Sequence, residues 1–138
     1  MKHEVNMSWT DKVAFEGDMD GHKIVIDAAV ENGGSDLGYR PKKLMLTALA
    51  GCTGIDVIMI LQKMKVEPEA FNVIVEADVT EEHPKHYTSM KVIYQFKGKN
   101  LPIDKLERAV QLSEEKYCGV TAAYKKAMKV ESEIRIVE

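Results

Sequence analysis

The feature that most constrains the fold is a long apolar segment near the middle of the chain. Residues 41–65 have helical periodicity, and Pro41 suits the first turn of a helix. Large apolar side chains cover nearly its whole circumference: Leu44, Met45, Leu46, Leu49, Ile55, Val57, Ile58, Met59, Ile60 and Leu61. A helix that is apolar on all sides is buried in a core or a membrane. Because a chain of 138 residues can hardly surround such a rod, we expect at least a dimer.

A buried central helix is favoured over a membrane span. The apolar segment contains Asp56 and two glycines, and lysines flank it, whereas a charged side chain is costly in the middle of a bilayer. The N-terminus has no apolar run behind its first basic residue, so the sequence predicts no secretory signal. We therefore expect a cytoplasmic protein without a membrane partner.

The composition predicts one globular domain over residues 1–138. The chain is 45% hydrophobic and 30% charged, which is ordinary for a soluble protein, and its length suits a single core. The formal net charge is -3, and the lysines are scattered among acidic residues. Because nucleic-acid binding normally requires a basic patch, we expect no nucleic-acid partner.

The periodicity outside the central helix predicts an α+β fold with largely antiparallel sheet. Turn residues separate short alternating segments that we predict to be strands at residues 4–9, 12–16, 22–28, 71–80, 87–97 and 133–138. Helical segments are expected at residues 104–111 and 114–128, with Ser113 as a possible N-cap of the second. The order is therefore three strands, one long helix, two strands, helices and a final strand.

The two cysteines are the main candidates for chemistry. Cys52 lies between Gly51 and Gly54 in the central helix, and each glycine costs about 1 kcal/mol relative to alanine in a helix interior. With Ala48, the glycines form a strip of small residues that would admit a second helix or a small ligand beside the thiol. Buried free cysteines are also common as small core residues, so a purely structural role remains an alternative.

A thiol redox cycle would use both sulfurs. A peroxide oxidises one thiolate to sulfenic acid, and a second cysteine, here Cys118, converts that to a disulfide. The cysteine spacing fits neither a CxxC motif nor a zinc motif, and no phosphate loop or dinucleotide fingerprint is present. We therefore expect no metal and no cofactor. His22, beside an Asp-rich turn, is a candidate for the rim of an active site.

Two segments resemble the OsmC/Ohr family of osmotically inducible and organic hydroperoxide resistance proteins. Residues 38–65, GYRPKKLMLTALAGCTGIDVIMILQKMK, are similar to the family's central helix, in which a cysteine follows a proline by eleven residues, here Pro41 and Cys52. The segment LSEEKYCGV is similar to the second family signature, with Cys118 as its cysteine. The predicted order of elements also matches, so the resemblance covers nearly the whole chain.

The resemblance implies an intertwined homodimer in which two long helices lie back to back, wrapped by sheet from both chains. It also implies a thiol peroxidase active in protection against oxidative stress. Cys52 would attack an organic hydroperoxide in an apolar pocket at the dimer interface. Cys118 would be the resolving thiol, and a dithiol would re-reduce the pair.

The chain departs from the family's well-studied peroxidases at two positions. Those proteins hold and activate the thiolate with an arginine from the N-terminal strands and a glutamate just after the proline. Here Lys42 and Lys43 follow Pro41, and no arginine precedes Arg40. A nearby cation normally lowers a thiol pKa, so Arg40, Lys42 and Lys43 are candidate binding residues. A non-catalytic dimer that binds a small apolar molecule is the main alternative.

Overall fold

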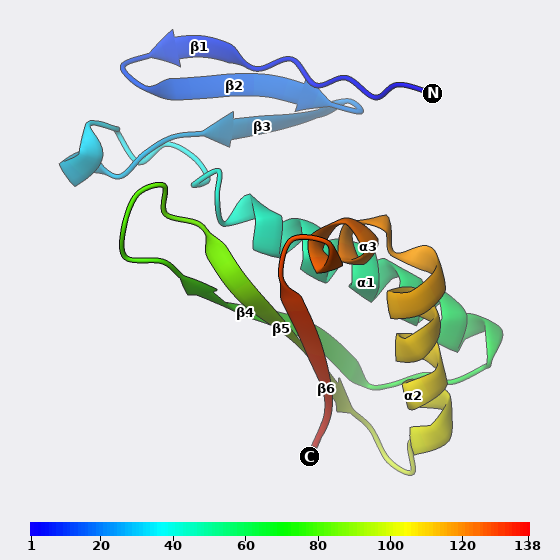
Figure 1. The fold of residues 1–138 in the computed structure, drawn as a ribbon. Coiled ribbons are helices and arrows are strands. Elements are labelled where there is room, and N and C mark those ends of the chain that lie inside the picture. Colours follow the sequence, from blue (N-terminus) through cyan, green and yellow to red (C-terminus); the bar gives the residue numbers. More distant parts are fainter. The chain divides into compact units, whose positions relative to one another are not determined.

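The computed structural model describes residues 1–138 and confirms the α+β class. The chain forms two compact units, Met1–Met45 and Leu46–Glu138. Each unit contains one three-stranded sheet; α1 precedes the strands of the second sheet, and α2 and α3 lie between its last two strands (Figure 1). This arrangement matches the predicted order of elements.

The N-terminal unit is an antiparallel meander of β1 (Ser8–Asp11), β2 (Ala14–Met19) and β3 (His22–Ile26). Asp20 and Gly21 form the turn between β2 and β3, and both have positive φ, as a two-residue hairpin turn requires. The predicted strands at 4–9 and 12–16 are wrong in their bounds. Lys12, with φ of 48°, starts the first turn, so both strands lie further along the chain than expected.

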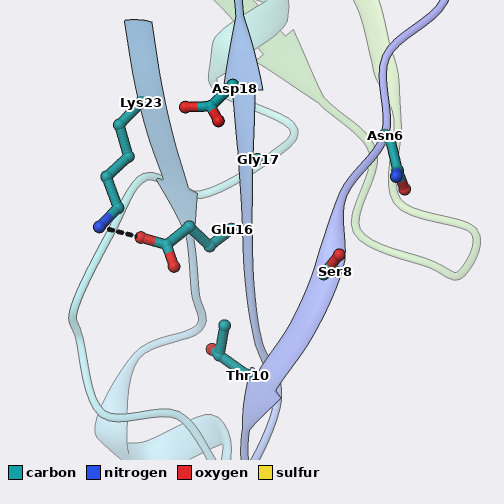
Figure 2. Close-up of a pocket in the computed structure, with 7 residues that line it drawn as sticks. All are labelled: Asn6, Ser8, Thr10, Glu16, Gly17, Asp18 and Lys23. Atoms are coloured by element: carbon teal, nitrogen blue, oxygen red, sulfur yellow. Dashed lines mark ion pairs between the residues drawn. The ribbon is translucent and has the colours of Figure 1, made fainter.

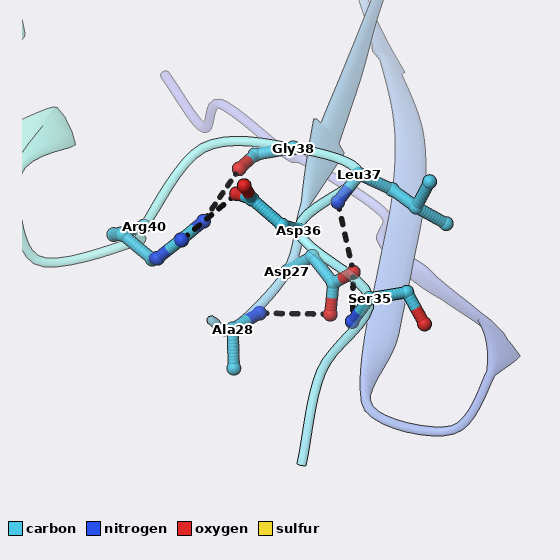
Figure 3. Close-up of polar contacts among 7 residues, drawn as sticks. All are labelled: Asp27, Ala28, Ser35, Asp36, Leu37, Gly38 and Arg40. Atoms are coloured by element: carbon cyan, nitrogen blue, oxygen red, sulfur yellow. Dashed lines mark hydrogen bonds and ion pairs between the residues drawn. The ribbon is translucent and has the colours of Figure 1, made fainter. Parts of the chain in front are cut away.

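A buried carboxylate organises the loop that follows β3. Asp27 accepts hydrogen bonds from the backbone N–H groups of Ala28 at 2.7 Å, Ser35 at 3.0 Å and Leu37 at 3.1 Å (Figure 3). The three donors lower the pKa of the Asp27 carboxyl below its ordinary value, with the Leu37 N–H as the largest cause. A Cβ at Gly38 would overlap the Val25 carbonyl oxygen. The loop therefore needs glycine where its backbone meets β3.

The C-terminal unit is a mixed sheet with helices on one side. Its elements are α1 (Leu44–Lys63, begun at the end of the first unit), β4 (Ala70–Val79), β5 (Tyr87–Lys97), α2 (Ile103–Leu112), the π-helical turn η2 (Ser113–Tyr117), α3 (Gly119–Lys125) and β6 (Lys129–Val137). The strand order is β4-β5-β6. The β4–β5 pair is antiparallel and the β5–β6 pair is parallel. In Figure 1 the three helices lie to the same side of this sheet.

The central strand β5 carries the core of this unit. Its inward side chains Met90, Val92, Tyr94 and Phe96 are each at most 2% exposed. They pair with the inward face of β4 in the register Ala77↔Met90, Val75↔Val92, Val73↔Tyr94 and Phe71↔Phe96. The last pair stacks its rings at a centroid distance of 4.5 Å. Period-two alternation along both strands therefore places these side chains on one face of the sheet.

Helix α1 is shorter than the predicted 41–65 and only one of its faces is buried in the single chain. Leu49, Thr53, Val57 and Leu61 form the buried stripe, with the i, i+4 spacing of one helix face. By length and composition alone α1 could cross a membrane, with a window of mean hydropathy 2.1, but core helices pass the same test. Ile55 and Met59 remain 61% and 52% exposed.

The predicted helix at 114–128 is interrupted at Cys118 and ends earlier, at Lys125, and Ser113 is not the N-cap that the sequence offered. Ser113 has right-handed helical dihedral angles and continues from α2 into η2. The break comes at Cys118, whose extended backbone (φ -80°, ψ 103°) begins α3. Strand β6 also starts earlier than the predicted residue 133, because Lys129 already pairs with Ser89. Apolar periodicity alone does not reveal a π-helical turn.

We expect Asp27→Asn to lower the melting temperature at pH 7 by more than Asp36→Asn does. An asparagine offers one acceptor oxygen, and its NH₂ group would face the converging backbone N–H donors of Figure 3. Because folding lowers the pKa of Asp27 from 3.8, its stabilisation is present above that value and is lost as the pH falls below it. Thermal melts of both variants between pH 7 and pH 2 test this. Equal shifts at pH 7 would contradict it.

Candidate functional site

The structure brings Cys52 and Cys118 together. The Cys118 S–H group donates to Cys52 Sγ across 2.8 Å, and both thiols are free. Cys118 is buried, with 3% of its surface exposed, whereas Cys52 on α1 is partly accessible. The two cysteines are therefore close enough to react with each other, and Cys52 is the one that a reagent can reach.

The π-helical turn η2 positions Cys118. The Cys118 backbone N–H donates to the Ser113 carbonyl oxygen at 2.7 Å, which closes the wide turn. The backbone is then extended at Cys118, where α3 starts. Cys118 Sγ takes the place of an N-cap oxygen, because the Thr121 N–H donates to it at 3.3 Å. The sulfur is therefore held by the backbone on both sides of the helix break.

Acidic and hydroxyl side chains surround the sulfurs. Asp56 lies one turn after Cys52 on α1, and its Oδ2 accepts a hydrogen bond from the buried Ser113 hydroxyl at 3.0 Å. The ligating atoms of Cys52, Asp56 and Cys118 all lie within 4.8 Å of one another. Tyr94, fully buried on β5, donates its hydroxyl to Glu114 Oε1 at 3.1 Å. The site is thus rich in acceptors and carboxylates.

These surroundings disfavour the Cys52 thiolate. Burial raises the pKa of the Cys52 thiol above its ordinary value of 9.0, and the Cys118 sulfur and the Asp56 charge raise it further. The Val120 backbone N–H acts in the opposite direction. Burial, followed by the Glu114 charge, raises the pKa of Tyr94 too, so that hydroxyl stays a neutral donor. Within this unit, Cys52 is therefore mainly a thiol at neutral pH.

The glycines beside Cys52 have different roles. A Cβ at Gly54 would lie 3.3 Å from Val73 Cγ2, so this glycine lets α1 approach β4 of its own chain. A Cβ at Gly51 would meet nothing within 4 Å in the single chain. The interpretation of both as clearance for a second helix is therefore wrong for Gly54.

The other predicted site residues, Arg40, Lys42, Lys43 and His22, all belong to the N-terminal unit. The Arg40 guanidinium donates to the Gly38 carbonyl oxygen at 3.0 Å and forms an ion pair with Asp36 at 2.8 Å (Figure 3). His22 is exposed at the start of β3, opposite Met19. Lys42 is exposed in the turn before α1. Arg40 therefore already has an anionic partner in its own loop.

Two cavities differ sharply in what they offer. One of about 550 Å³ on the N-terminal sheet is lined by Asn6, Ser8, Thr10, Glu16, Gly17, Asp18 and Lys23 (Figure 2). Two opposite charges in this cavity, Lys23 and Glu16, form an ion pair with each other. No thiol or histidine lines the cavity. The second, of about 180 Å³, is lined by Asp56, Met59, Ile60, Lys63 and Tyr117. It lies next to the cysteine pair through Asp56, and its wall combines the apolar Met59 and Ile60 with Lys63 and Tyr117.

Sequence reasoning missed Asp56, Ser113 and Glu114 as parts of the site. The spacing of Asp56 four residues after Cys52 places both on one helix face, and that signal was available. Ser113 is 57 residues from its partner Asp56, and Glu114 meets Tyr94 across 20 residues. No local pattern encodes these pairs, because they depend on how η2 packs.

Fold and site together define a class: an α+β protein that holds two free thiols in contact, one on a long helix and one at a helix break. Comparison with known proteins assigns the family. Residues 33–133 match the family described as OsmC-like protein, and the chain belongs to that family.

The relatives support this assignment along the whole chain. Protein YhfA of Escherichia coli K12 is 31% identical over 135 residues, covering 97% of this chain and 98% of YhfA. The crystal structure of a hypothetical protein from Aquifex aeolicus is 30% identical, with full coverage of both chains and a TM-score of 0.81. An organic hydroperoxide resistance protein OsmC from Legionella pneumophila has the same fold, with 17% identity, 98% and 97% coverage and a TM-score of 0.67.

We expect Asp56→Asn to speed the alkylation of Cys52 by iodoacetamide at pH 7.5. Removing the negative charge lowers the Cys52 pKa, since that charge raises it, and the thiolate is the reactive form. The difference from the wild type should disappear at a pH above both pKa values. Mass spectrometry of the Cys52 peptide measures the rate, with exposed Glu115→Gln as the charge-matched control. A slower rate would mean that Asp56 instead accepts the thiol proton.

Proposed function

We propose that this protein is a two-cysteine thiol peroxidase that reduces organic hydroperoxides and thereby protects against oxidative stress. The observation that carries the proposal is the 2.8 Å approach of the two sulfurs, with the attacking Cys52 accessible and Cys118 buried. Membership of the OsmC-like family, whose fold the Legionella hydroperoxide resistance protein shares, supports a redox role.

The proposed cycle needs only the two thiols, a hydroperoxide and a dithiol. The Cys52 thiolate attacks the distal peroxide oxygen, the O–O bond breaks, and an alcohol leaves as Cys52 becomes sulfenic acid. Cys118 then attacks the Cys52 sulfur, which forms the disulfide and releases water. A dithiol reduces the disulfide by exchange and leaves as its own disulfide. The cavity beside Asp56, with Met59 and Ile60 in its wall, suits an apolar substituent.

Activation of Cys52 is the demanding step. The raised pKa of Cys52 means that its thiolate fraction is small near pH 7 and grows as the pH rises. A cation at the sulfur would reverse this. Arg40, Lys42 and Lys43 remain the candidates, and we propose that such a cation comes from the N-terminal segment of a second copy. Without it, we expect slow turnover at neutral pH.

We expect reduced wild-type protein to lose both thiols when mixed with an organic hydroperoxide, at a rate that increases from pH 7 to pH 9. Cys52→Ser should fall to the uncatalysed rate, because it lacks the accessible nucleophile. Cys118→Ser should react once and stop at a sulfenic acid, since no second thiol resolves it. Thiol titration and trapping of the sulfenic acid by dimedone distinguish these outcomes. Thiol loss that is unchanged in Cys52→Ser would overturn the proposal.

The second candidate is a binding protein that does not turn over. The observation in its favour is the same raised pKa of Cys52, which weakens the case for a peroxidatic thiol. Such a protein would hold a small apolar molecule in the cavity beside Asp56. A shift in melting temperature with an unreactive alcohol analogue, combined with no hydroperoxide consumption at any pH, would favour this function over the first.

We also propose a homodimer built on the exposed face of α1. This face contains Ile55 and Met59, both more than half exposed, and the open side of Gly51. An apolar helix face with no partner in its own chain is costly in water, and the resemblance to OsmC/Ohr proteins supplies a second copy as its occupant.

We expect Ile55→Glu to weaken self-association by about 100-fold or more, because burying an isoleucine contributes about 1.5–3 kcal/mol and each dimer has two copies of the residue. Analytical ultracentrifugation across a dilution series measures the dissociation constant. Ile103→Glu, at a similarly exposed isoleucine on α2, is the matched control and should have no effect. A wild-type protein that sediments as a monomer would contradict the prediction.

A further inference from the structure

Three side chains that can bind a metal converge at the helix break. The ligating atoms of Cys52, Asp56 and Cys118 lie within 4.8 Å of one another. Cys52 and Asp56 are four residues apart on α1 and therefore project from one helix face. Cys118 approaches from the start of α3. The spacing in the sequence gives no metal motif, because the third ligand comes from a distant segment.

Asp56 and Cys118 have outer hydrogen bonds of the kind found around metal sites. Ser113 donates to Oδ2 of Asp56 at 3.0 Å, which fixes the carboxylate and leaves its other oxygen available. The Thr121 N–H donates to Cys118 Sγ at 3.3 Å, which holds that sulfur in place. Partners of this type orient ligands and commonly change metal affinity by about 10–100-fold. The cluster therefore has support beyond its three ligands.

A buried hydroxyl beside the cluster has an unfilled hydrogen bond. Thr121 is 1% exposed, and its Oγ1 has no hydrogen-bond partner. An unsatisfied buried polar group costs about 1–3 kcal/mol. The Thr121 backbone N–H bonds Cys118 Sγ, so this unsatisfied hydroxyl belongs to a residue in direct contact with the cluster.

From these observations we infer that the reduced protein binds Zn²⁺ through Cys52, Cys118 and Asp56. Two thiolates and a carboxylate are a zinc donor set, whereas Mg²⁺ and Ca²⁺ prefer oxygen ligands alone. Three protein ligands leave a fourth tetrahedral position open for water, as in sites where zinc exchanges or reacts. At Zn–S distances near 2.3 Å, tetrahedral geometry needs sulfurs about 3.8 Å apart. The partly accessible Cys52 side chain must therefore swing outward by roughly 1 Å.

Zinc binding and disulfide formation exclude each other, because both use the same two sulfur atoms. A Zn²⁺ ion would block attack of Cys52 on a peroxide and keep the thiols reduced until the metal is removed. This inference does not depend on the proposed peroxidase. The protein can bind zinc even if hydroperoxides are never consumed.

The test is an anaerobic titration of the reduced full-length protein with Co²⁺ followed by Zn²⁺. We expect a near-ultraviolet thiolate-to-cobalt band and visible bands of tetrahedral cobalt, both lost on adding one equivalent of Zn²⁺. Zn²⁺ should also slow alkylation of both thiols by at least tenfold. Cys118→Ser should lose about half of the thiolate band, and Asp56→Asn should keep the band but bind at least tenfold more weakly.

Controls separate this site from other metal binding. Glu115→Gln removes an exposed carboxylate from η2, the turn that precedes Cys118, and should leave the zinc affinity unchanged. Circular dichroism of each variant shows whether it is folded. Ser113→Ala keeps all three ligands and removes only the hydrogen bond to Asp56, so it should weaken zinc affinity less than Asp56→Asn does. Absence of the thiolate band would overturn the inference, as would an affinity that is equal in the wild type, Cys118→Ser and Asp56→Asn.

Discussion

The hydrogen bond from Tyr94 to Glu114 is the contact on which the site depends. Tyr94 is fully buried at the centre of β5, and it pairs with Val73 on β4 and Ile134 on β6. Val73 is also the side chain that limits the approach of α1 at Gly54. One row across the sheet therefore locates both α1 and η2. Because Cys52 lies on α1 and Cys118 directly follows η2, the separation of their sulfurs is set by this row of the sheet.

Much of this fold follows from local patterns in the sequence. Period-two alternation gave β5 its observed bounds, because a strand with one buried face must alternate. The long helix was evident from its apolar length. The N-terminal strands were misplaced because the turn falls at Lys12, which carries no glycine or proline signal. The η2 turn was missed because its polar residues, SEEKY, look like ordinary helix in the sequence.

The candidate site was only partly predictable. The residues themselves make Cys52 and Cys118 the candidates for chemistry, the family resemblance implies their roles, and the structure places their sulfurs in contact. The sequence does not predict the carboxylate environment. It depends on η2 placing Ser113 against Asp56 on α1 and Glu114 against Tyr94 on β5, and no sequence pattern predicts that turn. Charge alone makes Arg40 a candidate in the sequence, and its pairing with Asp36 arises from a loop conformation fixed by Asp27.

The two activities inferred for the cysteine pair share one physical requirement, which is positive charge. Burial and the Asp56 charge keep the pKa of Cys52 high, so the C-terminal unit by itself stabilises the unreactive thiol. A divalent cation held between the sulfurs and Asp56 would satisfy these negative groups and leave the thiols protected. An arginine or lysine brought to the sulfur by a second copy would satisfy them differently, leaving the thiolate free to attack. Because of Asp56, the reactivity of Cys52 depends on which cation approaches. A metal ion would keep the sulfur protected, whereas an arginine or lysine would leave it as a nucleophilic thiolate.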